Sequence, residues 1–516
     1  MLKSKFLIFS FFILFTKFSF SQEKGIDEII NEAFQPISSF WESLVFHEFF
    51  GTGIPTIIFI LVGGAAFFTI YFGFINIRGF GLSLKTVMGK YDKLDDERSN
   101  NGEVSHFQAL ATAVSGTVGN GNIAGVAMAI ALGGPGATFW MILCGILGMS
   151  SKFVECTLGV KYREIGSDGT VYGGPMYYLK KGLSEIGYGK LGKVLGITFA
   201  ILCIGASFGG GNAAQSNQAA MQLVNSFGMT GGSARTVIGI IMMILVGIII
   251  IGGIKRIASV TEKIVPFMAG IYVLACLYII ITNFTFIDDA FGLIFSQAFS
   301  PPAAVGGFIG VLIQGFRRGA FSNEAGSGSA SIAHSAVITS YPASEGLVAL
   351  LEPFIDTVVI CTMTALVIII FNGDNTMFTY GKTVGDGTAV MIQGQQLSGA
   401  GITSAAFSKY ISFSGPFLTI AVVLFALSTM ISWSYYGLQS WMYVFGKGKV
   451  ADLTYKILFL VFIVIGAAGD MSSVWAFSDA MILSLVFPNM IGLFLLFPKV
   501  KNELSTYIDK IKNKTN

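Results

Sequence analysis

The residues from Phe107 to Ser151 form a stretch of 45 positions that contains no aspartate, glutamate, lysine or arginine. This is enough for two membrane-spanning helices, because one crossing of a bilayer needs about 20 apolar residues. Yet the first half contains Ser115-Gly116-Thr117-Val118-Gly119-Asn120-Gly121-Asn122. Glycine and asparagine are poor helix formers. The stretch therefore combines the length of two spans with an interruption near the middle of the first.

The whole chain has the composition that this stretch suggests. Of its 516 residues, 53% are hydrophobic and 12% are charged, and the mean hydropathy is +0.71. Average soluble proteins have about 25% charged residues, so too little polar surface is available for a soluble fold of this length. We predict an all-α polytopic membrane protein embedded in a lipid bilayer. The net charge of +3 gives no reason to expect a nucleic-acid partner.

Eleven apolar stretches are long enough to be transmembrane helices. They lie near residues 54–75, 107–131, 136–158, 194–224, 235–253, 262–283, 302–326, 346–372, 414–445, 452–469 and 474–498. With the N-terminus outside, 24 of the 32 lysines and arginines fall on the inside, Arg317 and Arg318 among them, and four fall on the outside. Positive residues favour the cytoplasmic side. We therefore expect a bacterial inner-membrane protein with a periplasmic N-terminus and a cytoplasmic tail, 499–516.

The N-terminus has the pattern of a signal peptide over residues 1–21. Lys3 and Lys5 precede a short apolar run, and small residues stand before Gln22. The alternative is an uncleaved anchor helix. The following segment, 22–50, is expected to lie on the periplasmic surface as an amphipathic helix broken by Pro36. Residues 51–76 form an extra transmembrane helix.

A second glycine-rich interruption, Gly319 to Gly328, follows about 200 residues after the first. A broken helix survives in lipid only where it is buried in protein or lines a wet cavity. The alternative is that the glycines form a tight helix-packing face. Each interruption opens a unit of five predicted spans, 107–284 and 302–498. Because five is odd, the second unit is inverted relative to the first, which is typical of a transporter.

Motifs for catalysis and for structural metals are absent from the sequence. It has three histidines and no triad, zinc motif or phosphate-binding loop. The five cysteines fall in predicted spans without metal-ligand spacing, and we interpret them as small apolar residues. We expect no enzyme, no catalytic residue and no cofactor.

Several stretches resemble the alanine/glycine:cation symporter family. They are Phe107–Gly136, Phe139–Met141 with Gly148–Glu155, Tyr172–Tyr178, Arg317–Gly328 and Trp433–Gly437. The resemblance implies a leucine-transporter-type fold with a five-plus-five inverted repeat, two broken helices and one extra N-terminal span. It also implies import of alanine or glycine with a cation, usually sodium. Asn120 stands where the family usually has threonine, which leaves the substrate preference open.

The first interruption is expected to bind the substrate. Backbone N–H groups of Asn120 and Gly121 at the start of a half-helix can bind a carboxylate, aided by the helix dipole. The string also resembles the first break of neurotransmitter-type sodium symporters. By that resemblance, Asn122 and the carbonyl of Thr117 face the substrate and one sodium position.

A second sodium position is implied by the same resemblance. The carbonyls of Ser115 and Val118 and the adjacent hydroxyls of Ser428 and Thr429 would surround it, because sodium prefers oxygen ligands. The alternative is that these two hydroxyls bond back to their own helix.

Five further residues are candidates for the substrate site. Gln215 lies in a polar patch within the fourth span, and the family resemblance places it against the amino acid; the alternative is an interhelical hydrogen bond. Trp433 lies one helical turn after Thr429 and would cap a small pocket. Phe321, Ser322 and Asn323 line the second break by the same reasoning.

Five acidic residues lie in or near the spans: Glu155, Glu324, Glu352, Asp356 and Asp479. Intramembrane carboxylates point to function, although structural hydrogen-bond anchoring is equally compatible. Glu324 is expected to pair with Arg317 or Arg318 as an inside gate. A carboxylate of this group could also transfer a proton, so proton coupling stays an alternative to sodium. A membrane sensor or a channel is the less favoured alternative. We expect a monomer.

Overall fold

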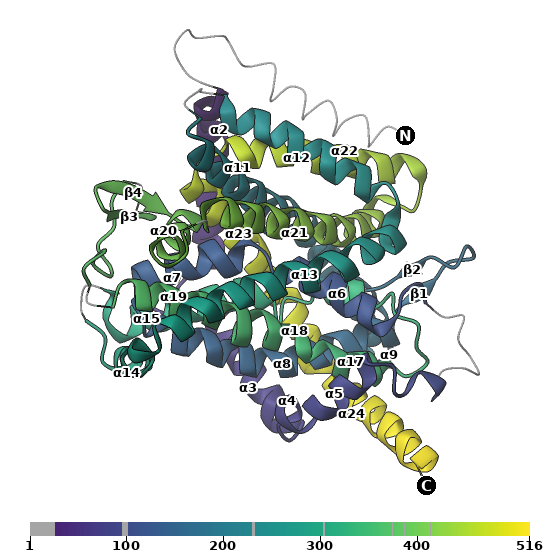
Figure 1. Ribbon diagram of the computed structural model, residues 1–516. Coiled ribbons are helices and arrows are strands. Elements are labelled where there is room, and N and C mark those ends of the chain that lie inside the picture. Colours follow the sequence, from purple (N-terminus) through teal and green to yellow (C-terminus); the bar gives the residue numbers. More distant parts are fainter. Residues whose placement is uncertain are drawn as a thin grey trace.

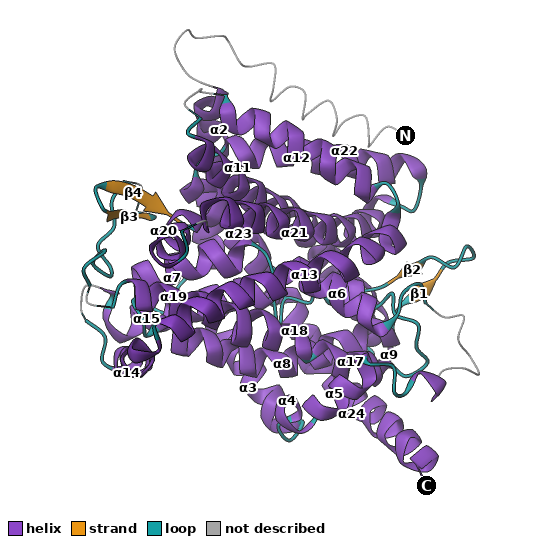
Figure 2. Cartoon of the chain, in the orientation of Figure 1, coloured by secondary structure: helices purple, strands orange, loops and turns teal. Residues whose placement is uncertain are grey.

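The computed structural model describes residues 26–94, 102–229, 233–302, 305–373, 375–385, 387–412 and 414–515. Helices make up most of the described chain, as Figure 1 and Figure 2 show. Two short antiparallel hairpins accompany them: β1 (Glu164–Ile165) pairs with β2 (Val171–Tyr172), and β3 (Ala389–Ile392) pairs with β4 (Gln395–Ser398). The fold class is therefore the predicted all-α class.

The α-helices follow one another along the chain. In the first half they are α2 (Ile26–Val45), α3 (Thr56–Tyr71), α4 (Ile75–Arg78), α5 (Phe80–Val87), α6 (His106–Thr117), α7 (Val126–Gly133), α8 (Ala137–Lys161), α9 (Pro175–Glu185), α10 (Gly189–Phe208), α11 (Ala214–Phe227), α12 (Ala234–Ile250) and α13 (Gly253–Thr282). In the second half they are α14 (Ile287–Phe299), α15 (Gly307–Asn323), α16 (Ser331–His334), α17 (Pro342–Ala349), α18 (Leu351–Pro353), α19 (Thr362–Phe371), α20 (Ala400–Tyr410), α21 (Ser414–Phe445), α22 (Lys449–Ala468), α23 (Met471–Ser484) and α24 (Val486–Thr515).

Three π-helical segments interrupt the long helices within the described residues. They are η2 (Gly121–Gly125), η3 (Gly209–Ala213) and η6 (Phe354–Cys361). Short 3-10 turns, η1 (Asp92–Leu94) and η4 (Phe284–Phe286), lie in connections. A π segment holds one residue more per turn than an α-helix and often marks a functional site.

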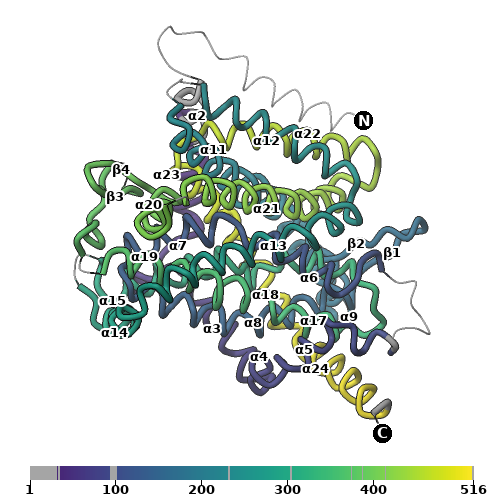
Figure 3. The backbone as a smooth tube through the Cα atoms, viewed as in Figure 1, coloured from purple at the N-terminus to yellow at the C-terminus, as the bar shows by residue number. Residues whose placement is uncertain are grey.

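The long helices lie side by side, and their connections gather at two opposite ends. In the tube view of Figure 3, β1–β2, α9 and the C-terminus lie at the right end, and β3–β4, α14 and α20 lie at the left end. We call these the hairpin-1 end and the hairpin-2 end. Lys181 of α9 and Lys447 of the connection after α21 both pair with Glu164 of β1 at the hairpin-1 end. The orientation in the membrane stays a prediction.

Each of the eleven predicted stretches overlaps a helix, and the ninth matches α21 at both ends. Seven helices of the described chain are long and apolar enough to cross a membrane when interrupted helices are joined, and three shorter apolar helices accompany them. The exact span count and the inverted repeat stay predictions. All five cysteines are buried and unpaired, as expected.

The N-terminal expectations have mixed outcomes. The expected signal peptide, 1–21, lies outside the described residues. An amphipathic helix follows as α2, but it continues through Pro36, so the predicted break is wrong. The physical reason is that α2 packs along α23, where the Ser38 hydroxyl donates to the Ser473 carbonyl at 2.8 Å and holds the residues after the proline in place.

Glycine packing, the alternative considered for the glycine-rich sequence, is found between α8 and α17. A Cβ atom added to Gly346 would meet the Thr157 hydroxyl and the Phe153 carbonyl oxygen, the latter at 2.7 Å. The backbone of α17 can therefore lie this close to α8 only because position 346 has no side chain.

We predict that Gly346→Ala lowers the apparent melting temperature of the purified protein, because overpacking of this kind costs about 1–3 kcal/mol. Gly63→Ala on α3 is the matched control, since no atom lies within 4 Å of its added Cβ. Thermal unfolding in detergent measures both. Equal melting temperatures for the two variants would contradict the close contact.

Candidate functional site

The first interruption breaks one membrane helix into α6 and α7. A capping box of Ser105 and Gln108 starts α6, which ends at Thr117. Val118 then leaves the helical conformation with ψ at 89°, and η2 begins at Gly121. The break predicted over 115–122 is thus confined to the residues between Thr117 and Gly121. All of them are buried.

Asn122 joins this break to the second half of the chain. Its side-chain oxygen accepts from the Gly119 N–H at 2.9 Å. Its amide nitrogen donates to the Ser322 hydroxyl at 3.0 Å and to Asp356 Oδ1 at 2.6 Å. One amide side chain therefore satisfies a freed backbone group and holds α15 and η6 against the break.

The second interruption begins later than the sequence predicts. Residues from Gly319 to Asn323 are helical and complete α15, whereas Glu324 has a left-handed conformation with φ at 53° and ends it. Ser322 donates to Asp356 Oδ2 at 2.7 Å and Asn323 donates to Thr357 at 3.0 Å. Hydrogen bonds to η6 hold the last turn of α15, and they explain why Gly319 does not interrupt the helix.

Gln215 lies against the first break, at the start of α11. Its Oε1 accepts from the Asn120 N–H at 2.9 Å, and the Asn120 side chain donates to the Gln215 carbonyl at 3.2 Å. This is the interhelical hydrogen bond considered as the alternative for Gln215. One of the two N–H donors predicted for a substrate carboxylate is therefore bonded to Gln215 in this conformation.

The residues of the predicted second sodium position lie together. The Ser115 hydroxyl donates to the Ser428 carbonyl at 2.8 Å, and the Ser428 hydroxyl bonds back to the Phe425 carbonyl of its own helix at 3.0 Å. Thr429 Oγ1 is buried and accepts or donates no hydrogen bond within the described part of the chain. It faces Gly119, whose added Cβ would collide with it. The oxygen-rich surroundings suit a hard cation.

Trp433 is fully buried between the two breaks. Its indole N–H donates to Glu324 Oε1 at 3.0 Å, and its ring occupies the space that a side chain at Gly211 of η3 would need. Phe321 packs its ring against Trp475 with centroids 5.3 Å apart and lies beside Gly121. Thr117 turns its hydroxyl back to the Ala113 carbonyl at 3.3 Å.

The expected gate between Glu324 and an arginine is wrong. Arg317 and Arg318 both pair with Asp479 of α23, at 2.7 and 2.8 Å. They lie within α15, not in an inside loop, and Arg317 also contacts Glu42 of α2 at 3.4 Å. Both arginines lie within α15 on the side that α2 covers, whereas Glu324 lies at the start of the break and bonds Trp433 instead.

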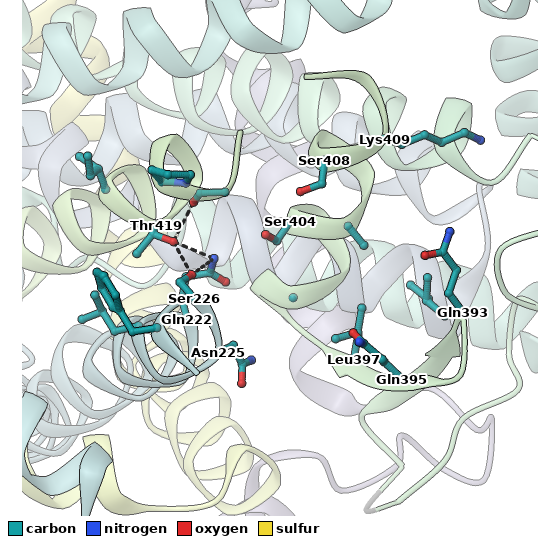
Figure 4. A pocket seen from close by; sticks show the side chains of 18 of the residues that line it. Gln222, Asn225, Ser226, Gln393, Gln395, Leu397, Ser404, Ser408, Lys409 and Thr419 are labelled. Atoms are coloured by element: carbon teal, nitrogen blue, oxygen red, sulfur yellow. Dashed lines mark hydrogen bonds between the residues drawn. The ribbon is translucent and has the colours of Figure 1, made fainter. Parts of the chain in front are cut away.

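A cavity of about 1160 Å³ opens at the hairpin-2 end, between α11, α20, α21 and β3–β4. Figure 4 shows Gln222, Ser226 and Thr419 at its wall, joined by hydrogen bonds. It contains no residue of the predicted site. The site itself is tightly packed and is covered by α20, whose Thr403 hydroxyl donates to the Ile123 carbonyl of η2 at 3.1 Å.

Sequence reasoning misses two parts of this arrangement. It leaves Asp356 among four acids without an assigned role, because the position of this residue on η6 opposite Asn122 depends on how two distant helices pack. It does not single out Thr403, because α20 lies in a region predicted as an outside loop. No local sequence signal distinguishes either residue from its neighbours.

The comparisons with known proteins agree with this geometry. Residues 38–516 match the model of the sodium:alanine symporter family. The sodium/alanine symporter AgcS of Methanococcus maripaludis is 39% identical over 460 residues, which are 89% of this chain and 95% of AgcS. The probable sodium/glutamine symporter GlnT of Bacillus subtilis is 36% identical, over 87% of each chain.

Among solved structures, MhsT in complex with L-phenylalanine is similar, with a TM-score of 0.50 and 15% sequence identity. The match covers 78% of this chain and 99% of MhsT. At this identity the likeness shows the fold alone, which is that of the leucine-transporter type.

We predict that Gly119→Ala lowers the affinity for a labelled amino acid by about tenfold or more. The added methyl group would push the break away from Gln215 Oε1, 2.9 Å from that position, and from Thr429. Gly125→Ala, six residues on, is the control, because its Cβ would make only ordinary contacts with Trp475. Equilibrium binding to purified protein measures the effect. Unchanged affinity in Gly119→Ala would exclude this break as the binding site.

Proposed function

We propose a function from one established premise: the chain belongs to the sodium:alanine symporter family. It is a secondary active transporter that imports a small neutral amino acid, alanine or glycine, together with sodium by alternating access. The observation that supports this most directly is the meeting of two buried helix breaks through Asn122, Ser322 and Asp356. Broken helices of this kind provide the free N–H and carbonyl groups that a zwitterion and a cation need.

Different residues of the site bind the substrate and the sodium ion. Asn120 and Gly121 present N–H groups to the substrate carboxylate once Gln215 releases the Asn120 N–H. The carbonyls of Ser115, Thr117 and Val118 and the hydroxyl of Thr429 surround sodium. Because both ligands use the same short break, binding of one orders the groups that bind the other, and this couples their movements.

Access to the site alternates between the two ends of the molecule. At the hairpin-2 end, the Arg318–Asp479 pair and α20 cover the site. This end faces the periplasm in the proposed topology, and the lysine-bearing hairpin-1 end faces the cytoplasm. The protein lies in the bacterial inner membrane, and a monomer suffices because the residues of both breaks come from one chain.

The substrate is small because Trp433 and Phe321 fill the space beside the breaks. One relative is named a probable sodium/glutamine symporter, and glutamine has a larger side chain than alanine or glycine. Proton coupling is the alternative to sodium; one relative is named a putative sodium/proton-dependent alanine carrier.

We expect that removing sodium abolishes uptake of labelled alanine and glycine into proteoliposomes, because the oxygen ligands of the break lose their cation. Replacement of sodium by choline at constant ionic strength provides the measurement. A proteoliposome sample with a pH gradient and without sodium is the companion measurement. Undiminished uptake in that sample would refute sodium coupling and favour protons.

We also expect Trp433→Leu to admit bulkier neutral amino acids, because it opens space beside Gly211. The measurement is competition by a series of amino acids against labelled alanine. Trp441→Leu is the control on the same helix, since Trp441 packs against Phe445 and Tyr455, away from the breaks. An unchanged competition profile in Trp433→Leu would show that Trp433 does not limit substrate size.

A further inference from the structure

Glu345 of α17 connects the two broken helices at the hairpin-1 end. One carboxylate oxygen contacts Nδ1 of His106, the first residue of α6. The other contacts Nδ1 of His334, the last residue of α16, at 2.5 Å. All three side chains are buried, with Glu345 and His334 at 0% exposure. We propose that Glu345 is a positioning residue that holds the half-helices α6 and α16 together through these two histidines, and that protonation of the histidines sets how firmly it does so.

Backbone hydrogen bonds beside this bridge join the same two broken helices. The segment before α6 pairs with the segment after α16: the Glu103 N–H donates to the Ala336 carbonyl at 2.7 Å, and the Ile338 N–H donates to the Val104 carbonyl at 2.8 Å. Arg163 of the connection after α8 donates to the Ser335 carbonyl at 2.8 Å. The half-helices can separate at this end only if these bonds open together.

The charges around the bridge explain why it responds to protons. His334 Nε2 faces Glu352 Oε2 at 3.5 Å, and Glu352 pairs with Lys152 at 3.1 Å. Glu155 lies 3.8 Å from the same ammonium group. The carboxylates of Glu345, Glu352 and Glu155 and the ammonium group of Lys152 together carry a charge of about minus two. Two protonated imidazoles would balance this charge. Other titratable or charged groups near the bridge include Glu324 at the end of α15, Cys156 of α8, Tyr178 of α9, Glu262 of α13, Tyr436 of α21, Tyr507 of α24 and, in the adjoining connections, Glu103 and Arg163.

These charges determine the direction in which pH changes the strength of the bridge. A protonated imidazole attracts the carboxylate of Glu345 by its charge as well as by the hydrogen bond, whereas a neutral imidazole donates the hydrogen bond alone. Burial opposes the charge of His334, but the carboxylates of Glu345 and Glu352 outweigh this effect and raise the pKa of the imidazole to about 9. Low pH therefore strengthens the bridge and high pH weakens it. Since α6 and α16 must separate for substrate to leave at this end, transport is slower when the cytoplasmic pH is below the pKa of His334 than when it is above; this last step rests on the proposed function.

The experiment measures amide hydrogen exchange of the full-length protein in lipid nanodiscs at about pH 7 and about pH 10, on either side of the pKa of His334. After correction for intrinsic exchange rates, we expect the peptides containing the Glu103 and Ile338 amides to lose protection by about threefold or more at the higher pH. Glu345→Gln should remove most of this pH response. Glu503→Gln is the control, because Glu503 pairs with Lys161 at the same end but joins α24 to α8. It should keep the response of the unmodified protein.

A second variant covers the case in which Glu345→Gln fails to fold. His106→Asn keeps a neutral donor near the position of Nδ1 and removes one titrating group, so the pH response should be smaller while the fold is retained. Proteoliposome uptake at fixed internal pH should rise with that pH in the unmodified protein and rise less in His106→Asn. Protection that does not change with pH, or an unchanged response in both variants, would overturn the bridge. Absence of uptake with an intact exchange response would instead overturn the proposed function.

Discussion

The whole structure depends on satisfying backbone groups where a membrane helix is broken. An unpaired N–H or carbonyl costs several kcal/mol in lipid. At the first break, the Gly119 N–H is bonded to the Asn122 side chain and the Asn120 N–H to the Gln215 side chain. The polar residues that look misplaced in an apolar span are therefore the partners that make the break stable. Because these partners are side chains, a ligand can replace them without leaving the backbone unpaired.

The two breaks are interdependent through a short chain of polar contacts. Asn122 and Ser322 lie 200 residues apart in sequence, yet both bond to the Asp356 side chain. A change in one break alters the hydrogen bonds of the other, because the buried carboxylate of Asp356 accepts from Asn122 and from Ser322. The hairpin-1 end repeats this arrangement with Glu345 between His106 and His334. In both places one acid on the segment from Pro342 to Phe371 holds two broken helices.

Sequence reasoning predicts the features that depend on local pattern. The apolar lengths of the helices, the first break near Gly119 and the burial of the cysteines follow from composition along the chain. The partner of a charged residue does not: Arg317 and Arg318 bond Asp479, 161 residues or more away, because α15 packs beside α23. The start of the second break at Glu324 is also beyond prediction, since bonds from Ser322 and Asn323 to η6 keep the preceding glycine helical.

The three π segments lie where the site residues converge. Asn122 lies within η2, Gln215 follows η3 by two residues and Asp356 lies within η6. Each segment holds one residue that an α-helix of the same length would not accommodate. Loss of one residue from such a segment would let it relax to a regular α-helix. The helix beyond would keep its face, because the wide turn absorbs the extra residue, but the wide turn that carries a residue such as Asn122 or Asp356 would be lost. Relatives that keep the site must therefore keep the spacing of these segments as strictly as their residue types.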